Sequence, residues 1–167
     1  EISPFKVADV GTNAILLRAE RDLLALAEQF GSADEREAIT ARIARKEIVL
    51  AELWDGVLGH YLSRDLIGGN LIPVRTSAGF LPIFAGLHEH ARALAQRLEA
   101  WRARGIALVP STDPDAAAFE PQRYWRGPVW AVVNWMIARG LREASEGGAA
   151  GSVAEETRRL IGEAGFS

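Results

Sequence analysis

The residues of this sequence best suited to chemistry lie together at positions 124–130, in the run Tyr-Trp-Arg-Gly-Pro-Val-Trp. Three of the five tryptophans of the chain fall within eleven residues that begin in this run. Aromatic faces stack on the C–H faces of sugar rings and leave the ring hydroxyls free for hydrogen bonds. Tyr124, Trp125 and Trp130 lie at the end of an expected loop and in the first turn of an expected helix, so we predict that they bind a sugar. Trp135 lies farther along that apolar helix, so we predict that it is a core residue.

Three neighbouring residues could act together with the aromatic rings. Arg126 carries a planar guanidinium with five donors, which suits a substrate carboxylate, the ring oxygens of a sugar or the positioning of the loop itself. Gly127 permits a close approach of the backbone to another group. Glu120 is an acidic residue close to the run, so contact of its carboxylate with a substrate stays open beside a role within the loop.

The acidic residues in expected loops and turns are the candidates for proton transfer. A glycoside hydrolase needs two carboxylates, roughly 5 Å apart for retention or about 6.5–9.5 Å apart for inversion of the anomeric centre. The sequence does not show which residues meet at such distances. Most of them are equally explained as helix caps and turn formers. They are Asp9, Asp55, Asp65, Asp113, Asp115 and Glu120.

The triplet His88-Glu89-His90 offers two histidines two residues apart, but the surrounding periodicity is helical. Residues i and i+2 of a helix point about 200° apart, so these side chains do not chelate one metal ion together. We expect a solvated first helical turn here and no metal site. The sequence also lacks a Gly-x-Ser-x-Gly elbow, a phosphate-binding glycine loop and a dinucleotide fingerprint. This excludes serine hydrolases and nucleotide enzymes, and we expect no cofactor.

The composition restricts the partners and the location of the protein. The 167 residues carry 19 basic and 22 acidic side chains, a formal net charge of −3, without the basic excess of a surface that binds nucleic acid. The absence of cysteine excludes a disulfide scaffold, thiolate catalysis and cysteine-ligated metals, and it fits the reducing cytoplasm, where we expect the protein. No apolar run approaches the roughly 18 residues of a membrane span, so we expect no membrane partner. The sequence leaves a homo-oligomer open.

Hydrophobic periodicity predicts about six helices and one small β-hairpin. Apolar residues at three- and four-residue spacings favour helices over residues 13–30, 32–54, 79–87, 88–104, 128–141 and 153–164. The first helix is expected to bury a stripe made of Ile15, Leu16, Ala19, Leu23, Leu26, Ala27 and Phe30. The glycines at 68 and 69 predict the turn of a hairpin between residues 58–62 and 71–74.

The connections between these helices differ in length. Residues 105–126 contain three prolines and are expected to form a long connection without regular structure, of the kind that is usually functional or disordered. Residues 146–152 are expected to form a glycine-rich break. Pro128 suits the first turn of a helix, and Ser32 or Asp34 suits an N-cap. The absence of alternating strand–helix units indicates an all-α architecture, in which each helical hairpin exposes an apolar face that another must cover.

The run 124–130, followed by Asn134 and by Gly140-Leu141, resembles the signature of the (α/α)6-barrel glycoside hydrolases of family 63. Within that family it most resembles the bacterial glucosylglycerate and mannosylglycerate hydrolases. The resemblance extends over nearly the whole chain, although Thr12 stands where the family usually has an aromatic residue. Its further landmarks are Asn13-Ala14, Leu53-Trp54-Asp55, Val74-Arg75-Thr76 and Gly79-Phe80-Leu81-Pro82.

The resemblance implies an inverting hydrolysis of glucosylglycerate, or mannosylglycerate, to sugar plus glycerate. It implies an aspartate as general acid upstream of Glu1 and a glutamate as general base directly after Ser167, and therefore no catalytic residue within this chain. Tyr124, Trp125 and Trp130 carry over as the aromatic part of the sugar subsite. We expect residues 1–167 to be a single segment, incomplete at both ends, that supplies about half of an (α/α)6 barrel with one small hairpin insertion.

Two alternatives stay open at this point. The tryptophan cluster could anchor a protein partner in a non-catalytic helical interaction module, because Trp and Arg dominate binding hot spots. The chain could also belong to another enzyme on the same toroid, such as a trehalase, a debranching enzyme or a lyase, since a fold does not decide a function. Tyr124, Trp125 and Trp130 lining a concave pocket would favour an enzyme, and the same residues on a flat exposed patch would favour the interaction module.

Overall fold

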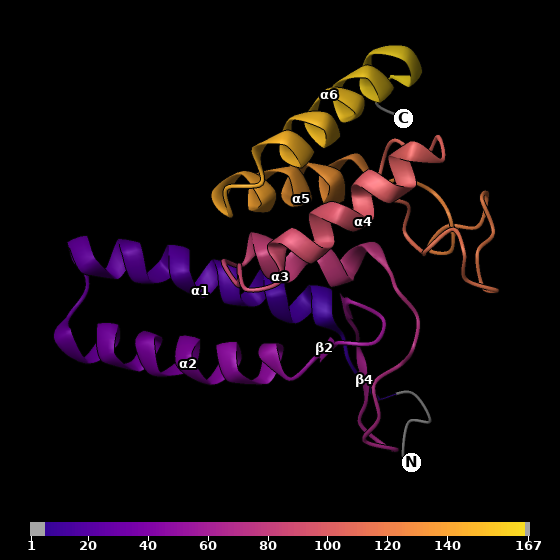
Figure 1. The fold of residues 1–167 in the computed structure, drawn as a ribbon. Helices are drawn as coiled ribbons and strands as arrows, with labels where there is room; N and C mark the ends of the chain where they lie inside the picture. Colours follow the sequence, from indigo (N-terminus) through magenta and orange to yellow (C-terminus); the bar gives the residue numbers. More distant parts are fainter. Residues whose placement is uncertain (1–5, 166–167) are drawn as a thin grey trace.

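The computed structural model describes residues 6–165 and contains, within them, six α-helices and one 3-10 helix (Figure 1). These are α1 (Val10–Phe30), α2 (Ala33–Ala51), η1 (Ser77–Phe80), α3 (Leu81–Phe84), α4 (Ala91–Ala103), α5 (Ala131–Glu143) and α6 (Gly147–Ala164). Two antiparallel pairs of two-residue strands accompany them, β1 (Val7–Ala8) with β4 (Arg64–Asp65) and β2 (Trp54–Asp55) with β3 (His60–Tyr61). The predicted all-α class is confirmed.

The helices are arranged as neighbouring pairs. The short helix α3 contacts both α1 and α5, while α2 packs on α1 and α6 packs on α5. In Figure 1, α1 and α2 run side by side at one end of the molecule, α5 and α6 lie at the other, and the long loop after α4 lies on the same side as the strand pairs. This arrangement brings the start of α1, the 3-10 helix η1 and the loop before α5 together.

The ends of the first two helices follow the rules of capping. Asp9 caps α1, because its Oδ1 accepts a hydrogen bond of 2.7 Å from the backbone N–H of Thr12. Ser32, rather than Asp34, caps α2 and forms a reciprocal capping box with Glu35. Such caps satisfy backbone donors that the helix itself leaves unpaired.

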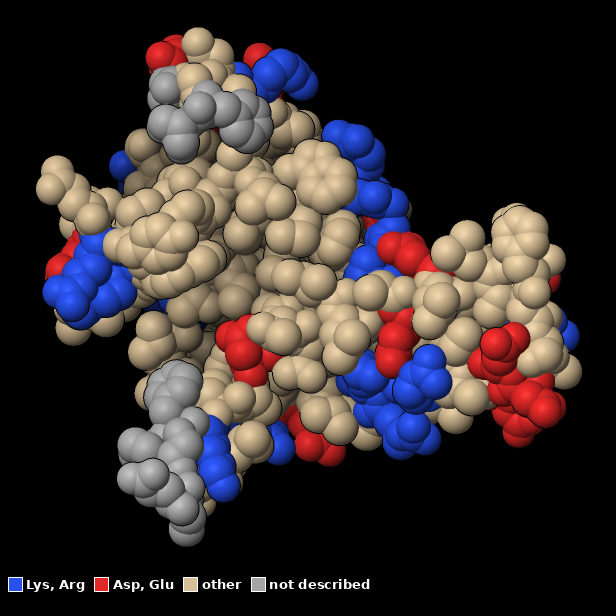
Figure 2. All heavy atoms as spheres, turned by 180° about the vertical axis from the view of Figure 1, so that it is seen from behind, with Lys and Arg blue, Asp and Glu red and all other residues tan. Residues whose placement is uncertain are grey.

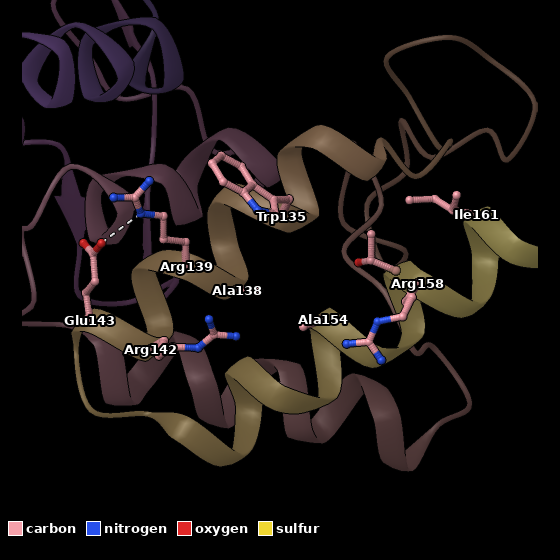
Figure 3. Close-up of a pocket in the computed structure, with 9 residues that line it drawn as sticks. Trp135, Ala138, Arg139, Arg142, Glu143, Ala154, Arg158 and Ile161 are labelled. Carbon is pink, nitrogen blue, oxygen red and sulfur yellow. Dashed lines mark hydrogen bonds and ion pairs between the residues drawn. The ribbon is translucent and has the colours of Figure 1, made fainter. Parts of the chain in front are cut away.

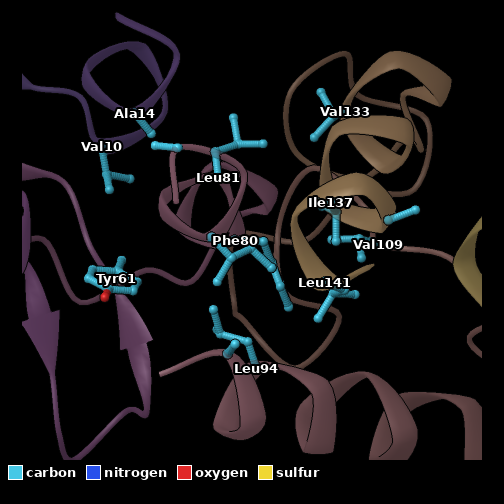
Figure 4. Packing of buried hydrophobic residues seen from close by; sticks show 14 of the residues in the cluster. Val10, Ala14, Tyr61, Phe80, Leu81, Leu94, Val109, Val133, Ile137 and Leu141 are labelled. Carbon is cyan, nitrogen blue, oxygen red and sulfur yellow. The ribbon is translucent and has the colours of Figure 1, made fainter. Parts of the chain in front are cut away.

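A single apolar core joins the three inner elements α1, η1–α3 and α5 (Figure 4). Phe80 is fully buried at its centre, with its ring centroid 4.9 Å from that of His60 and 6.0 Å from that of Trp101. Helix α5 approaches α3 so closely that a Cβ on Gly140 would lie 2.5 Å from the backbone nitrogen of Phe84. Glycine at this position lets the two backbones meet.

The buried face of α1 differs from the predicted stripe. Val10, Ala14, Leu17 and Ala27 are buried. Helix α1 has apolar residues on two faces, and in the described structure the second face is only partly covered. Of the predicted stripe only Ala27 is buried, so periodicity alone identified the wrong face for most of it. The predicted stripe residues that are exposed are Ile15, Leu16, Leu23, Leu26 and Phe30.

The predicted starts of the last two helices are also wrong. Helix α5 begins at Ala131 and not at Pro128, whose carbonyl instead accepts a hydrogen bond from Ser111 N. Helix α6 begins at Gly147, so most of the expected glycine-rich break is helical. The chain turns instead at Ser145, whose φ of 66° lies in the left-handed region. Hydrogen bonds within α6 and packing on α5 overcome the low helix propensity of glycine.

The expected hairpin is present in part. An isolated bridge pairs Arg64 with Leu71 around the predicted glycine turn, where Asp65 accepts from the N–H groups of Ile67 and Gly68. Residues 60–61 pair instead with Trp54–Asp55. The long connection after residue 105 is likewise more ordered than expected, because bridges pair Thr112 with Thr76 and Pro110 with Val129.

Large apolar side chains are exposed on α1, α2 and α5, among them Leu26, Ile48 and Val132. Figure 2, which views the molecule from behind, shows a broad stretch of uncharged surface in the middle of this face. Among residues 6–165, no helix combines the length and the apolar character that crossing a membrane requires.

Candidate functional site

The structure brings the three predicted sugar-binding residues together in one aromatic cluster. The ring centroids lie 5.4 Å apart for Tyr124 and Trp125, 4.7 Å for Tyr124 and Trp130, and 5.0 Å for Trp125 and Trp130. Two of the three pairs meet edge to face, the preferred geometry for aromatic rings. Tyr124 and Trp125 are exposed, at 65% and 58%, while Trp130 is partly buried beneath them. The cluster therefore presents aromatic faces to solvent.

Trp125 also lines a hollow of about 610 Å³ between α1, η1 and α5. Hydroxyl and carboxylate side chains form one part of its wall, and apolar side chains form the other. A wall of this mixed kind suits a small polyhydroxylated molecule, because it offers both hydrogen bonds and apolar contact. The hollow is lined by Asp9, Gly11, Thr12, Ile15, Thr76, Ser77, Ala78, Leu81, Ser111, Trp125, Val133 and Met136.

The loop that carries the cluster closes on itself through Arg126 and Glu120. Arg126 donates to the carbonyl of Ala118 at 2.9 Å and pairs with the Glu120 carboxylate at 2.7 Å. The backbone N–H of Glu120 returns a bond of 2.8 Å to the carbonyl of Arg126. A Cβ on Gly127 would collide with the carbonyl of Glu120. Of the roles considered for Arg126 and Glu120, the structure therefore supports the positioning of the loop.

Asn134 joins this loop to helix α5. It is fully buried, and its amide exchanges two hydrogen bonds with the backbone of Val109, at 2.9 Å and 3.0 Å. The same amide nitrogen donates to the carbonyl of Trp130 at 3.1 Å. Neutral polar groups are buried without penalty only when such bonds are made. The asparagine thus fixes the start of α5 beneath the aromatic cluster.

Most of the acidic candidates have local structural roles, as the turn and cap interpretation predicted. Asp55 accepts from the backbone N–H groups of Val57 and Leu58. Asp115 pairs with Arg104 at 2.7 Å, and hydrogen bonding from this guanidinium lowers the pKa of Asp115. Asp9 also has a structural role as the cap of α1, but unlike the other acidic candidates it lines the hollow. These contacts do not single out any two carboxylates within residues 6–165 as a general acid and a general base.

Asp113 is more than a turn former. Its side chain is only 1% exposed and forms an ion pair with Arg75, and its Oδ1 accepts from the backbone N–H of Asp115 at 2.9 Å. Its own N–H donates to the carbonyl of Arg75 at 2.9 Å. Sequence reasoning missed this pair, because the two residues lie 38 positions apart.

His60 is a second residue that sequence reasoning missed. Its ring is completely buried, and its Nε2 lies 2.9 Å from the carbonyl of Thr76. Burial lowers the pKa of His60 to about 4, and the positive charges of Arg97 and Arg75 act in the same direction. Within the described residues its Nδ1 has no hydrogen-bond partner. The ring is therefore a neutral donor that supports the wall of the hollow from below.

The histidine triplet is not a helical turn. Helix α4 begins at Ala91, after the triplet. His88 is exposed as expected, but His90 stacks on Trp54 with ring centroids 3.8 Å apart and an angle of 9° between the planes. Within residues 6–165, no group of three His, Cys, Asp or Glu side chains could hold a metal ion.

Trp135 is not a core residue, and this prediction is wrong. Its side chain is 53% exposed and lines a groove of about 500 Å³ between α5 and α6 (Figure 3). Arg139 on the next turn pairs with Glu143 at 2.9 Å and lies over the Trp135 ring at 5.9 Å. The buried face of α5 is made instead by Val133, Ile137 and Leu141.

Comparisons with known proteins identify the family. The model of the mannosylglycerate hydrolase MGH1-like glycoside hydrolase domain matches residues 1–167. The chain belongs to this family. The mannosylglycerate hydrolase of a Thermus thermophilus strain is 48% identical over 98% of this chain and 40% of that protein. The glucosylglycerate hydrolase of Mycolicibacterium hassiacum is 31% identical over 87% of this chain and 38% of that protein. The chain spans about two fifths of the length of these curated relatives.

Solved structures agree with the MGH1-like assignment. The GH63 mannosylglycerate hydrolase of a second Thermus thermophilus strain, crystallised with glucose, matches with a TM-score of 0.93 and 47% identity over 99% of this chain and 42% of that one. Neutral trehalase of Saccharomyces cerevisiae shares the fold, with a TM-score of 0.73 at 16% identity over 96% of this chain and 33% of that one. The predicted resemblance to family 63 and the predicted (α/α)6-barrel segment are confirmed.

In this MGH1-like chain one ring of the aromatic cluster, that of Trp125, lines the hollow. Trp125 forms part of the wall, and Tyr124 and Trp130 pack against it. The arrangement predicted for an enzyme is therefore met by Trp125, while Tyr124 and Trp130 support its ring from outside the lining. The cluster can cover the apolar face of a sugar, and three hydroxyl-bearing residues, Thr76, Ser77 and Ser111, line the same hollow.

Proposed function

We propose that this chain is part of a glycoside hydrolase that cleaves mannosylglycerate or glucosylglycerate to sugar plus glycerate, with inversion at the anomeric carbon. The observation that carries the proposal is the cluster of Tyr124, Trp125 and Trp130 beside a hollow with a hydroxyl-bearing wall. The curated relatives support the substrate class, and the higher identity to a mannosylglycerate hydrolase favours mannosylglycerate as the better substrate.

In this proposal the chain binds the sugar and does not transfer protons. Trp125 stacks on a C–H face of the sugar, Tyr124 and Trp130 hold its indole in place, and the hydroxyls of the wall bind ring hydroxyls. The general acid and the general base come from residues outside 1–167. An inverting enzyme uses them on opposite faces of the sugar, the acid at the leaving oxygen and the base at the attacking water. The cytoplasmic location and a homo-oligomer stay predictions.

The test is hydrolysis by the full-length protein that contains this chain. We expect turnover of mannosylglycerate, weaker turnover of glucosylglycerate, and first-formed sugar of the opposite anomeric configuration to the substrate, observed by proton NMR. Trehalose is the informative competitor, because trehalases share the fold. Turnover of trehalose alone, or a product that retains its configuration, would contradict the proposal. Appreciable turnover by the isolated 167-residue chain would contradict the assignment of both carboxylates to residues elsewhere.

A further inference from the structure

Residues 110–113 form a short segment that pairs with one other segment on each side. On one side, Thr112 bridges Thr76, and the N–H of Ser77 donates to the carbonyl of Ser111 at 3.2 Å. On the other side, Pro110 bridges Val129, and the N–H of Ser111 donates to the carbonyl of Pro128 at 3.0 Å. The segment therefore connects the wall of the hollow with the loop that carries the aromatic cluster.

Two buried hydroxyls of this segment hold the backbone on either side of Arg126. The Thr112 hydroxyl donates to the carbonyl of Trp125 at 3.0 Å. The Ser111 hydroxyl accepts from the N–H of Gly127 at 3.0 Å. Both residues are buried, Thr112 at 4% exposure. The backbone of Trp125 is thus held from beneath, while its indole stays exposed.

The position of Thr112 is in turn fixed by its neighbour. Asp113 is buried against Arg75, and its backbone N–H donates to the Arg75 carbonyl. A buried ion pair that is also hydrogen-bonded holds its partners in one geometry. Since Arg75 and Thr76 are consecutive, the ion pair and the Thr76–Thr112 bridge keep the same two segments in register.

We propose that Thr112 is a positioning residue for sugar binding, which sets the orientation of the Trp125 indole through its hydroxyl. The inference rests on the proposed function and adds to it a residue that itself lies outside the sugar-contacting wall. Thr112 is not among the residues that line the hollow, so its effect on a substrate is transmitted through Trp125. A misplacement of about 1 Å in a positioned contact lowers activity by up to about a hundredfold.

The experiment compares two threonines that each donate one hydrogen bond to a backbone carbonyl. Thr112→Val removes the bond to Trp125, and Thr157→Val is the control, since Thr157 is 7% exposed and donates to Val153 within α6 at 2.7 Å. In the full-length enzyme we expect both variants to lower the melting temperature to a similar extent. Thr112→Val alone should raise KM about tenfold with little change in kcat, the pattern of weakened substrate binding. Thr112→Ser should restore KM.

Unchanged KM in Thr112→Val, or an equal rise in Thr157→Val, would overturn the proposal. Absence of turnover in the wild-type enzyme would instead overturn the proposed function. The positioning role would then be tested on the Trp125 indole by fluorine NMR, which needs no substrate. With 5-fluorotryptophan in the protein, the resonance assigned to Trp125 through its loss in Trp125→Phe should shift in Thr112→Val and stay in place in Thr157→Val. An unmoved resonance would refute the positioning role without any substrate.

Discussion

Trp125 and Trp135 are exposed to nearly the same extent, 58% and 53%, yet they lie in very different surroundings. Trp125 packs against two other aromatic rings, borders a hollow with a hydroxyl-bearing wall, and is held through its backbone by Thr112. Trp135 lies on a helix face, packs against Phe84 and lines a groove that alanine, isoleucine and arginine side chains share (Figure 3).

The difference shows that an exposed tryptophan does not by itself mark a binding site. Around Trp125, polar groups fix the loop and leave the ring exposed beside hydroxyl-bearing residues. Around Trp135, the polar side chains of the α5–α6 groove are three arginines, one glutamate and one threonine, so charged groups rather than hydroxyls predominate. We expect perturbations of the first region to change sugar binding and perturbations of the second to leave it unchanged.

The largest expected effect concerns His60 beneath the loop. Its folded-state pKa of about 4 lies below the ordinary value of 6.5, so the unfolded chain binds more protons between these pH values. Its contribution to stability is complete above about pH 6.5 and is lost as the pH falls toward 4. The full loss is roughly 3 kcal/mol. Thermal melting from about pH 7 to about pH 4 should show a shallower decline in His60→Gln than in the wild type.

The matched control is His88→Gln, which replaces an exposed histidine. Its pH profile should coincide with that of the wild type. If the melting temperatures of His60→Gln and the wild type fell in parallel as the pH is lowered, the buried His60 ring would not account for the loss of stability in acid.

The next effect concerns Asn134, the residue directly before Trp135. Asn134→Ala leaves the N–H and carbonyl of Val109 without their partner and should cost about 2 kcal/mol in the free energy of unfolding, measured in urea. Asn13→Ala is the control, because Asn13 makes one exposed bond to the carbonyl of Asp9 and should cost less than about 1 kcal/mol. Equal losses would mean that the junction does not depend on the buried amide.

The smallest effect is expected in the α5–α6 groove. Arg139→Ala removes an exposed ion pair with Glu143 and a contact over the Trp135 ring. Exposed pairs of this kind contribute less than about 1 kcal/mol, so stability should fall only slightly and sugar affinity should not change. A clear loss of sugar affinity in Arg139→Ala would mean that the groove around Trp135 takes part in sugar binding, against the difference drawn between Trp125 and Trp135.

The aromatic run could be predicted from the sequence because its residues are neighbours along the chain. Their types and their place beside a helix start were enough to predict the Tyr124, Trp125 and Trp130 cluster. Trp135 could not be placed in the same way, because α5 has apolar residues on more than one face and only packing shows which face is buried. The same ambiguity made the prediction wrong for most of the α1 stripe.

The supporting residues were beyond sequence reasoning for a different reason. Asp113 meets Arg75, and His60 meets Thr76, only after the chain has folded across long separations. In the sequence, Ser111, Thr112 and Asp113 before a proline are typical of a turn. These residues become buried only when residues 75–77, 110–113 and 127–129 come together in the fold. Their hydrogen bonds can position the loop because they are buried.

The central claim is that the hollow beside Trp125 binds the sugar, and the most direct test is a paired substitution of the two exposed tryptophans. Trp125→Ala and Trp135→Ala in the full-length protein remove the same side chain at nearly equal exposure. Titration calorimetry with mannose, the sugar product that the active enzyme does not hydrolyse, should show a roughly tenfold weaker Kd for Trp125→Ala, equivalent to about 1.4 kcal/mol. Trp135→Ala should bind as the wild type does. Equal affinities in the two variants, or a loss confined to Trp135→Ala, would contradict the account.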